Sequence, residues 1–120
     1  MANIVPRSFG VSLLSAQHDF ATSGHTFKLA LYTTNPYDAA STVFVSTGEV
    51  STVGTNYIAG GNALTSQAVA TGAGSGTGAL VSTVDFANTV WGAATTGAAT
   101  FGAAFGAIYN TNTVDGLANR

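Results

Sequence analysis

The 120-residue sequence contains no cysteine, which excludes disulfide bonds, thiolate nucleophiles and cysteine metal sites. Charge is scarce as well: charged residues make up 7% of the chain, against roughly a quarter in an average domain. Three Lys/Arg and five Asp/Glu give a net charge of −2. Because so little charge gives weak repulsion between molecules, this composition indicates a protein whose surface is covered by neighbours in an assembly.

Basic side chains are too few and too scattered for a nucleic-acid-binding surface. They are Arg7, Lys28 and Arg120, which lie far apart in the sequence. Binding to a phosphate backbone draws much of its affinity from clustered positive charge. We therefore expect no nucleic-acid partner.

One uncharged stretch has to be weighed as a membrane span. Residues 90–109 carry no charge, and two of their glycines, Gly102 and Gly106, have the spacing found where membrane helices pack. Most residues of the stretch are Ala, Gly and Thr, whose side chains gain little free energy in lipid. We expect no membrane partner.

The length fits a single domain over residues 1–120. Residues 1–7 show no periodic pattern, and we expect a flexible N-terminal arm there. Residues 8–17 place apolar side chains at three- and four-residue spacing, which predicts a short helix. Since a helix of this length is not stable alone, Leu14 and Phe20 are its expected docking contacts.

Residues 25–120 predict a β domain. Residues 26–33 alternate between two faces with period two, as a half-buried strand does, and Val43–Val45 predicts a second strand. Gly60 and Gly61 tolerate the positive φ of a tight turn.

More strands are expected in the second half of the chain. Residues 63–70 and 79–86 are candidate partner strands, joined by a glycine-rich flexible loop over residues 71–78. Residues 99–109 alternate large and small side chains, and we favour a strand there because glycines cost an exposed helix about 1 kcal/mol each. Many short strands with glycine turns are typical of an antiparallel β-sandwich or jelly-roll-like fold, here with one short N-terminal helix.

Nothing in the sequence indicates an enzyme. Carboxylates are few and scattered, and no serine lies in a nucleophile-elbow pattern. His18, His25 and Asp19 do not have the spacing of metal ligands, and residues 72–78 lack the lysine of a phosphate-binding loop. We predict no catalytic residue, no cofactor and no metal.

Tyr37, Tyr57 and Trp91 are the candidate interface residues. Buried aromatic side chains supply much of the binding energy of protein interfaces, and Tyr37 and Tyr57 lie in turn-like sequence. The same side chains suit a hydrophobic core equally well, and the sequence leaves both alternatives open.

Three segments of the sequence, in this order, resemble those of a known group of proteins. They are HDFATSGHTFKLALYTT at 18–34, TGEVSTVGTNYIAGGNALT at 47–65 and DFANTVWGAATTGAATFGAAFGAIYNT at 85–111. In this order the chain resembles small virion proteins of tailed bacteriophages, some of which are capsid cement or decoration subunits with jelly-roll-like folds. Such proteins usually continue past the position of Arg120 into another apolar strand, so that strand lies outside the given sequence, is absent, or is supplied by a neighbour.

The resemblance implies a structural protein of the virion, assembled in the host cytoplasm. Its expected partners are the major capsid protein and copies of itself, in a homo-oligomer within the particle. A cement or decoration subunit is the first hypothesis, in which residues 1–7 and 72–78 order on assembly. A tail or head–tail joining component is the alternative hypothesis. A membrane-active or carbohydrate-binding β protein is a less favoured one.

Overall fold

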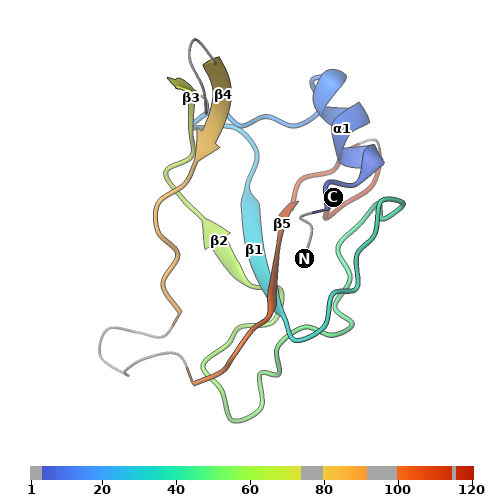
Figure 1. The fold of residues 1–120 in the computed structure, drawn as a ribbon, viewed down its shortest axis with the longest axis vertical. Helices are drawn as coiled ribbons and strands as arrows, with labels where there is room; N and C mark the ends of the chain where they lie inside the picture. The colour runs from blue at the N-terminus through green and yellow to red at the C-terminus, as the bar shows by residue number, and fades with distance from the viewer. Residues whose placement is uncertain (1–3, 74–79, 92–99, 115) are drawn as a thin grey trace.

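The computed structural model describes residues 4–73, 80–91, 100–114 and 116–120. The fold is mainly β, with one short helix and two antiparallel sheets (Figure 1), as the sequence predicts. The elements in chain order are α1 (Arg7–Leu14), β1 (Phe27–Tyr32), β2 (Asn62–Leu64), β3 (Ala68–Ala73), β4 (Leu80–Asp85) and β5 (Phe105–Asn110).

β1 is the middle strand of the larger sheet, which has the order β2–β1–β5. It pairs with β5 along its whole length, from Phe27↔Asn110 to Tyr32↔Phe105, and it confirms the strand predicted over residues 26–33. Tyr32 is fully buried on the core face of β1. Figure 1 shows β1 and β5 side by side through the middle of the molecule, with α1 to one side.

β3 and β4 form the smaller sheet, an antiparallel hairpin that extends to the pair Ala73↔Leu80. The predicted strand over residues 63–70 is confirmed in part. Residues 68–70 belong to β3 and pair with β4, as predicted, whereas residues 63 and 64 belong to β2 and pair with β1. The flexible loop predicted over residues 71–78 is wrong at its start, because the chain up to Ala73 is still bonded to β4. Residues 74–79, the rest of that predicted loop, lie outside the described residues.

The helix ends earlier than the sequence predicts. A helix was expected over residues 8–17, but α1 ends at Leu14, because Ala16 adopts a left-handed φ of 55°. The Gln17 N–H donates to Ser12 O at 2.9 Å, and the Ala16 N–H donates to the carbonyl of Leu13 at 3.1 Å. This pair of bonds is a Schellman ending, which satisfies the last carbonyls of the helix.

The N-terminal arm is also shorter than predicted. Residues 1–3 lie outside the described residues, whereas Arg7, the last residue of the predicted arm, belongs to α1. The Arg7 N–H donates to Ala39 O at 3.1 Å, and the Ser8 hydroxyl donates to Ser41 O at 2.9 Å. These two bonds attach the start of the helix to the loop that follows β1.

Aromatic rings, rather than the leucines of α1, connect the helical region to the sheet. Leu14 is 91% exposed, so its predicted docking role is wrong. Phe20 does dock: its ring stacks on Phe27 at a centroid distance of 4.4 Å. Within the helix, Phe9 lies 4.7 Å from the ring of His18.

The chain between β1 and β2 covers the core face of the sheet without forming a strand. The strand predicted at Val43–Val45 is therefore wrong. Its backbone groups are used elsewhere: the Phe44 N–H donates to Asn119 O at 2.7 Å, and the Val45 N–H donates to the Tyr37 hydroxyl at 3.0 Å. With these donors occupied, the segment has no free ladder of hydrogen bonds to offer a neighbouring strand.

β5 confirms a strand in the region 99–109 but is shorter. It starts at Phe105; residues 100–104 are not strand, and residue 99 lies outside the described residues. The alternation of the sequence holds within β5. Tyr109 is buried on the core face, while Ile108 on the opposite face is 58% exposed.

The turn before β2 needs its two glycines. Gly60 and Gly61 have φ values of +77° and +75°, as the sequence predicts. At Gly61 a side chain is also blocked, because a Cβ atom there would overlap the carbonyl oxygen of Leu29 in β1. This close approach sets how the chain enters β2.

We expect Gly61→Ala to destabilise the fold by roughly 3 kcal/mol or more, through steric overlap added to the cost of a positive φ. Gly54→Ala is the matched control, because Gly54 has a φ of +71° with nothing within 4 Å of an added Cβ. The control loses about 1 kcal/mol, the conformational term alone. Urea unfolding measures both, and equal losses would contradict the close approach at Gly61.

Candidate functional site

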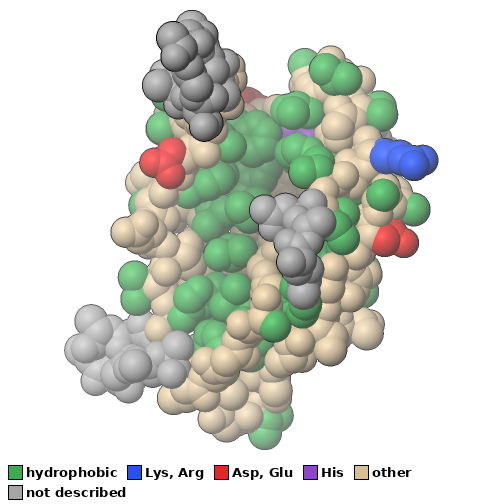
Figure 2. Space-filling view, in the orientation of Figure 1, with side chains coloured by type: hydrophobic (Ala, Val, Ile, Leu, Met, Phe, Trp, Pro, Cys, Tyr) green, Lys and Arg blue, Asp and Glu red, His purple; other side chains and the backbone are tan. Residues whose placement is uncertain are grey.

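An apolar groove of about 600 Å³ runs along the outer edge of β5. Hydrophobic side chains gather over this face of the molecule, which is hollowed between them (Figure 2). The walls come from the segment that enters α1, from residues 41–44 and from the end of β4. Among the described residues that line the groove, Arg120 is the only charged one. Its apolar lining includes Ile4, Val5, Phe44, Val84, Phe105 and Ile108.

The floor of the groove is an unpaired sheet edge. β5 is the last strand of its sheet, and it bonds to β1 on one side, where the Thr111 N–H donates to Thr26 O at 2.9 Å. Asn110 points the other way: its backbone N–H and C=O both bond to Arg120. Since backbone groups alternate sides along an antiparallel strand, those of Ile108 and Gly106 also point outward.

These outward groups have no partner among the residues that the structure describes. Outside the pairing with β1, no described residue bonds to the backbone N–H or C=O of Gly106 or Ile108. An open strand edge of this kind is a template for pairing with another strand. The groove therefore offers both apolar side chains and backbone hydrogen-bonding groups to a ligand.

Tyrosine hydroxyls fix the loop that forms one wall. The Tyr32 hydroxyl donates to Val45 O at 2.8 Å and lies 2.7 Å from the Tyr37 hydroxyl. The rings of Tyr32 and Tyr37 meet edge to face at 5.5 Å, and Phe44 stacks on Tyr109 at 4.4 Å. The loop is thus held on the core face of the sheet by hydroxyl bonds and ring contacts together.

A second hydroxyl network lies around Glu49. The Tyr57 hydroxyl donates to Glu49 Oε1 at 2.6 Å and accepts the Leu31 N–H at 3.0 Å. The same carboxylate oxygen accepts the Gly60 N–H at 2.6 Å, and the Tyr109 hydroxyl donates to Gly60 O at 2.7 Å. The half-buried carboxylate is therefore a structural acceptor that joins β1, β5 and the turn before β2.

Burial and these bonds hold the tyrosines protonated. Burial raises the pKa of Tyr32, Tyr57 and Tyr109 above the ordinary value. The bond to Tyr37 raises the pKa of Tyr32 further, and the bond to the Glu49 carboxylate raises that of Tyr57. Ionisation of any of the three would place a second negative charge near Glu49 or an uncompensated charge in the core.

We expect the contribution of these tyrosines to the free energy of unfolding to be level below about pH 9 and to fall above about pH 10. The unfolded chain loses tyrosine protons near its ordinary pKa of ~10, whereas the folded protein retains them, so the stability held at lower pH is lost as the pH rises. Urea midpoints at several pH values measure the slope. Tyr57→Phe, which removes one raised pKa, gives a shallower alkaline decline; an unchanged slope contradicts the assignment.

His18 and His25 meet at one buried amide. The side chain of Asn110 is 1% exposed, and its Oδ1 accepts the Asn112 N–H at 2.9 Å. The amide Nδ2 is therefore the group that faces the rings, 3.0 Å from Nδ1 of His18 and 2.8 Å from Nδ1 of His25. Both Nδ1 atoms accept, so each neutral ring carries its proton on Nε2.

We expect Asn110→Leu to cost about 3 kcal/mol of stability, because it leaves two imidazole acceptors without their donor. Asn112→Ala is the control: its exposed side chain accepts one bond, from the Thr26 N–H at 2.9 Å, and its loss costs about 1 kcal/mol. Urea unfolding compares the two variants. Nitrogen NMR shifts should show both rings as the Nε2–H tautomer, and an Nδ1–H form in either ring contradicts the arrangement.

The three predicted interface residues fall into two places. Tyr37 lines the groove beside β5. Tyr57 lies elsewhere, in the core, with 4% of its surface exposed, and Trp91 stacks on it at 5.2 Å. Phe101 closes this second cluster, 5.4 Å from the ring of Tyr57. The interface role of these residues stays a prediction.

The most informative groove residues were not singled out from the sequence. They are Gly106 and Ile108, whose backbone groups form the open edge. A signal was present: the small face of the alternating segment 99–109 indicates close approach by another chain. In the structure part of that space is filled from within, since a Cβ atom on Gly106 would lie 3.2 Å from Leu29 Cδ1.

The described residues assemble no metal centre. No group of three or more His, Asp and Glu side chains able to hold a metal ion occurs among them. Asp19, Asp38 and Asp85 are exposed and lie in different parts of the chain. Among the residues that the structure describes, no helix is both long enough and apolar enough to cross a membrane.

Comparisons with known proteins add no relative to this picture. The chain matches no protein-family model, no curated protein and no solved structure at a significant level. The chemistry of the groove and of the surface around it is therefore the basis for assigning a function.

Proposed function

We propose that this chain is a structural subunit of a bacteriophage particle. In this role it is a capsid cement or decoration protein, which stabilises the shell through contacts with the major capsid protein and with copies of itself. The observation that carries the proposal is the combination of an apolar groove on an open strand edge with a surface that has almost no charge. The sequence resemblance to small phage virion proteins points to the same setting.

Apolar exposure extends well beyond the groove. Scattered exposed apolar side chains are normal on any protein, but here they accompany a chain that is only 7% charged. Surfaces of this kind favour permanent contact with neighbouring subunits. The large exposed residues include Ile4, Val5, Val11, Leu13, Leu14, Val53, Ile58, Val69, Val90 and Ile108.

The sandwich or jelly-roll-like architecture expected from the sequence belongs to the same proposal. It is supported by the presence of two antiparallel sheets and by the ring of Phe86, just after β4, whose centroid lies 6.0 Å from that of Phe27 in β1. Both sheets are small, and each has open edges. Neighbouring subunits in a shell cover such edges and complete the layers.

Three titratable side chains, those of Glu49, His18 and His25, have structural roles that suit a mechanical function. Glu49 is bonded to Tyr57 and Gly60, and His18 and His25 share the amide of Asn110. None of these arrangements pairs a nucleophile with a base in the groove. We therefore propose binding, without catalysis, as the activity of this chain.

Copy number and position in purified particles test the proposal. We expect copies in proportion to the shell lattice, counted by quantitative mass spectrometry against the major capsid protein and located by imaging. Ile108→Lys, which places a charge in the groove, lowers incorporation; Ile58→Lys, similarly exposed at 62% against 58%, does not. A few copies at the tail or portal would assign the chain to tail or head–tail joining instead, and absence from the particle would reject both roles.

A further inference from the structure

We propose that the groove beside β5 binds Ile4 and Val5, the two residues before Pro6, of a second copy of this chain. That segment adds as a strand to the free edge of β5, so that copies are linked by exchanged N-terminal segments. The inference deepens the function proposed above and rests on it for the setting in which copies meet.

The edge of β5 already holds the beginning of an added strand. Arg120 donates its backbone N–H to Asn110 O at 2.8 Å and accepts the Asn110 N–H in return. This reciprocal pair is the hydrogen-bonding unit of an antiparallel sheet. It covers the end of β5 and leaves the next outward positions, Ile108 and Gly106, for another chain.

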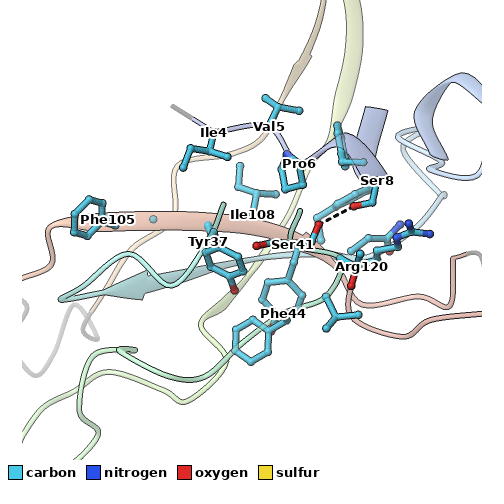
Figure 3. Close-up of a pocket in the computed structure, with 18 of the residues that line it drawn as sticks. Ile4, Val5, Pro6, Ser8, Tyr37, Ser41, Phe44, Phe105, Ile108 and Arg120 are labelled. Atoms are coloured by element: carbon cyan, nitrogen blue, oxygen red, sulfur yellow. Dashed lines mark hydrogen bonds between the residues drawn. The ribbon is translucent and has the colours of Figure 1, made fainter. Parts of the chain in front are cut away.

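The shape of the groove selects one extended strand. Walls stand on both sides of the edge, with the chain entering α1 on one side and Tyr37 and Phe44 on the other (Figure 3). The equally recessed edge of a second folded sheet cannot enter between them. A single strand can enter and gains main-chain bonds from the edge together with side-chain contacts from the walls.

The chain itself contains a segment of suitable chemistry. Ile4 and Val5 are uncharged and apolar, like the groove they border, yet they are 43% and 68% exposed. Pro6 has φ −59° and ψ 144°, and a proline holds the residue before it in extended conformation. The residues before Pro6 therefore favour the extended conformation of a strand, and their exposed apolar side chains can still be buried by a partner.

In its own chain this segment lies at the rim of the groove without pairing to the edge. Figure 3 shows Ile4, Val5 and Pro6 on the opposite side of the β5 ribbon from Tyr37 and Phe44. Among the described residues, no backbone hydrogen bond joins Ile4 or Val5 to β5. The bonds of Arg7 and Ser8 to the neighbouring loop hold the following turn of helix at the rim.

Exchange between copies uses both surfaces at once. Every copy carries one groove and one segment, so each subunit can donate to one neighbour and accept from another. Such head-to-tail contacts close into a ring when the rotation between copies permits. Repetition around a ring or a lattice lets individually weak strand contacts add up.

Introduced cysteines test the contact directly, because the chain has none of its own. Val5→Cys and Ile108→Cys are made as separate proteins, one of them isotope-labelled, then mixed and oxidised gently. Exchange brings the two Cα atoms to the separation of about 6 Å that a disulfide spans. We expect a mixed dimer, identified by the mass of the linked peptide.

The matched control pairs Val5→Cys with Ile58→Cys, since Ile58 is as exposed as Ile108 but lies outside the groove. The groove pair should cross-link about tenfold more than the control, because docking raises the local concentration of the two thiols. Equal yields would overturn the exchange. A double variant with both cysteines in one chain that forms only the intramolecular disulfide would also overturn it.

The same cross-link measured in purified particles separates this inference from the proposed function. Incorporation with no cross-link between copies overturns the exchange and leaves the structural role standing. A cross-link between free copies of a chain that never enters a particle supports the exchange and rejects the virion role. Circular dichroism and thermal unfolding of each cysteine variant confirm that the contact is tested on folded protein.

Discussion

Tyrosine hydroxyls, bonded across the core, are the constraint on which this structure depends. The long stretch between β1 and β2 has no strand of its own, yet it covers one face of the sheet. It is held there because the hydroxyls of Tyr32, Tyr57 and Tyr109 bond to Val45, Glu49 and Gly60. A buried hydroxyl left without a partner costs about 1–3 kcal/mol, so each bond fixes one point of the path. Only with the stretch in place does the groove beside β5 have its second wall.

The sequence could predict the parts of this fold that repeat along the chain. Period-two alternation located β1 and β5, and glycines located the turn at Gly60 and the hairpin of β3 and β4. It could not predict contacts made across long separations. Val43–Val45 has the composition of a strand, but its donors are taken by Tyr37 and Asn119. The side-chain amide that joins His18 and His25 belongs to Asn110, which lies 92 positions after His18 and 85 after His25. No local sequence pattern predicts this contact.

The open edge is a consequence of the same arrangement. The covering stretch is attached by tyrosine hydroxyls and by backbone bonds to the end of β1, at the bridge between Tyr32 and Glu49, and among the described residues it supplies no strand to lie beyond β5. Proteins that stay apart usually protect such an edge with lysine, proline, a bulge or an overlying element. Here the outward positions are Gly106 and Ile108, neither of which is charged, and the backbone pairing with Arg120 lies at Asn110, beyond both of them. The edge has the properties of a surface that is completed by another chain.

Low charge determines how such a surface can work. Association guided by charge is fast and strongly salt-dependent, and a chain with three basic and five acidic residues gains little from it. Backbone hydrogen bonds and apolar burial remain as the source of affinity, and both act only at contact. A freely diffusing protein with one weak contact of this type would remain mostly unbound. On a lattice each neighbour is already in place, so the entropic cost of association is shared over many contacts. Apolar exposure, an open strand edge and scarce charge are therefore consistent with one another in a protein that functions as one of many identical copies.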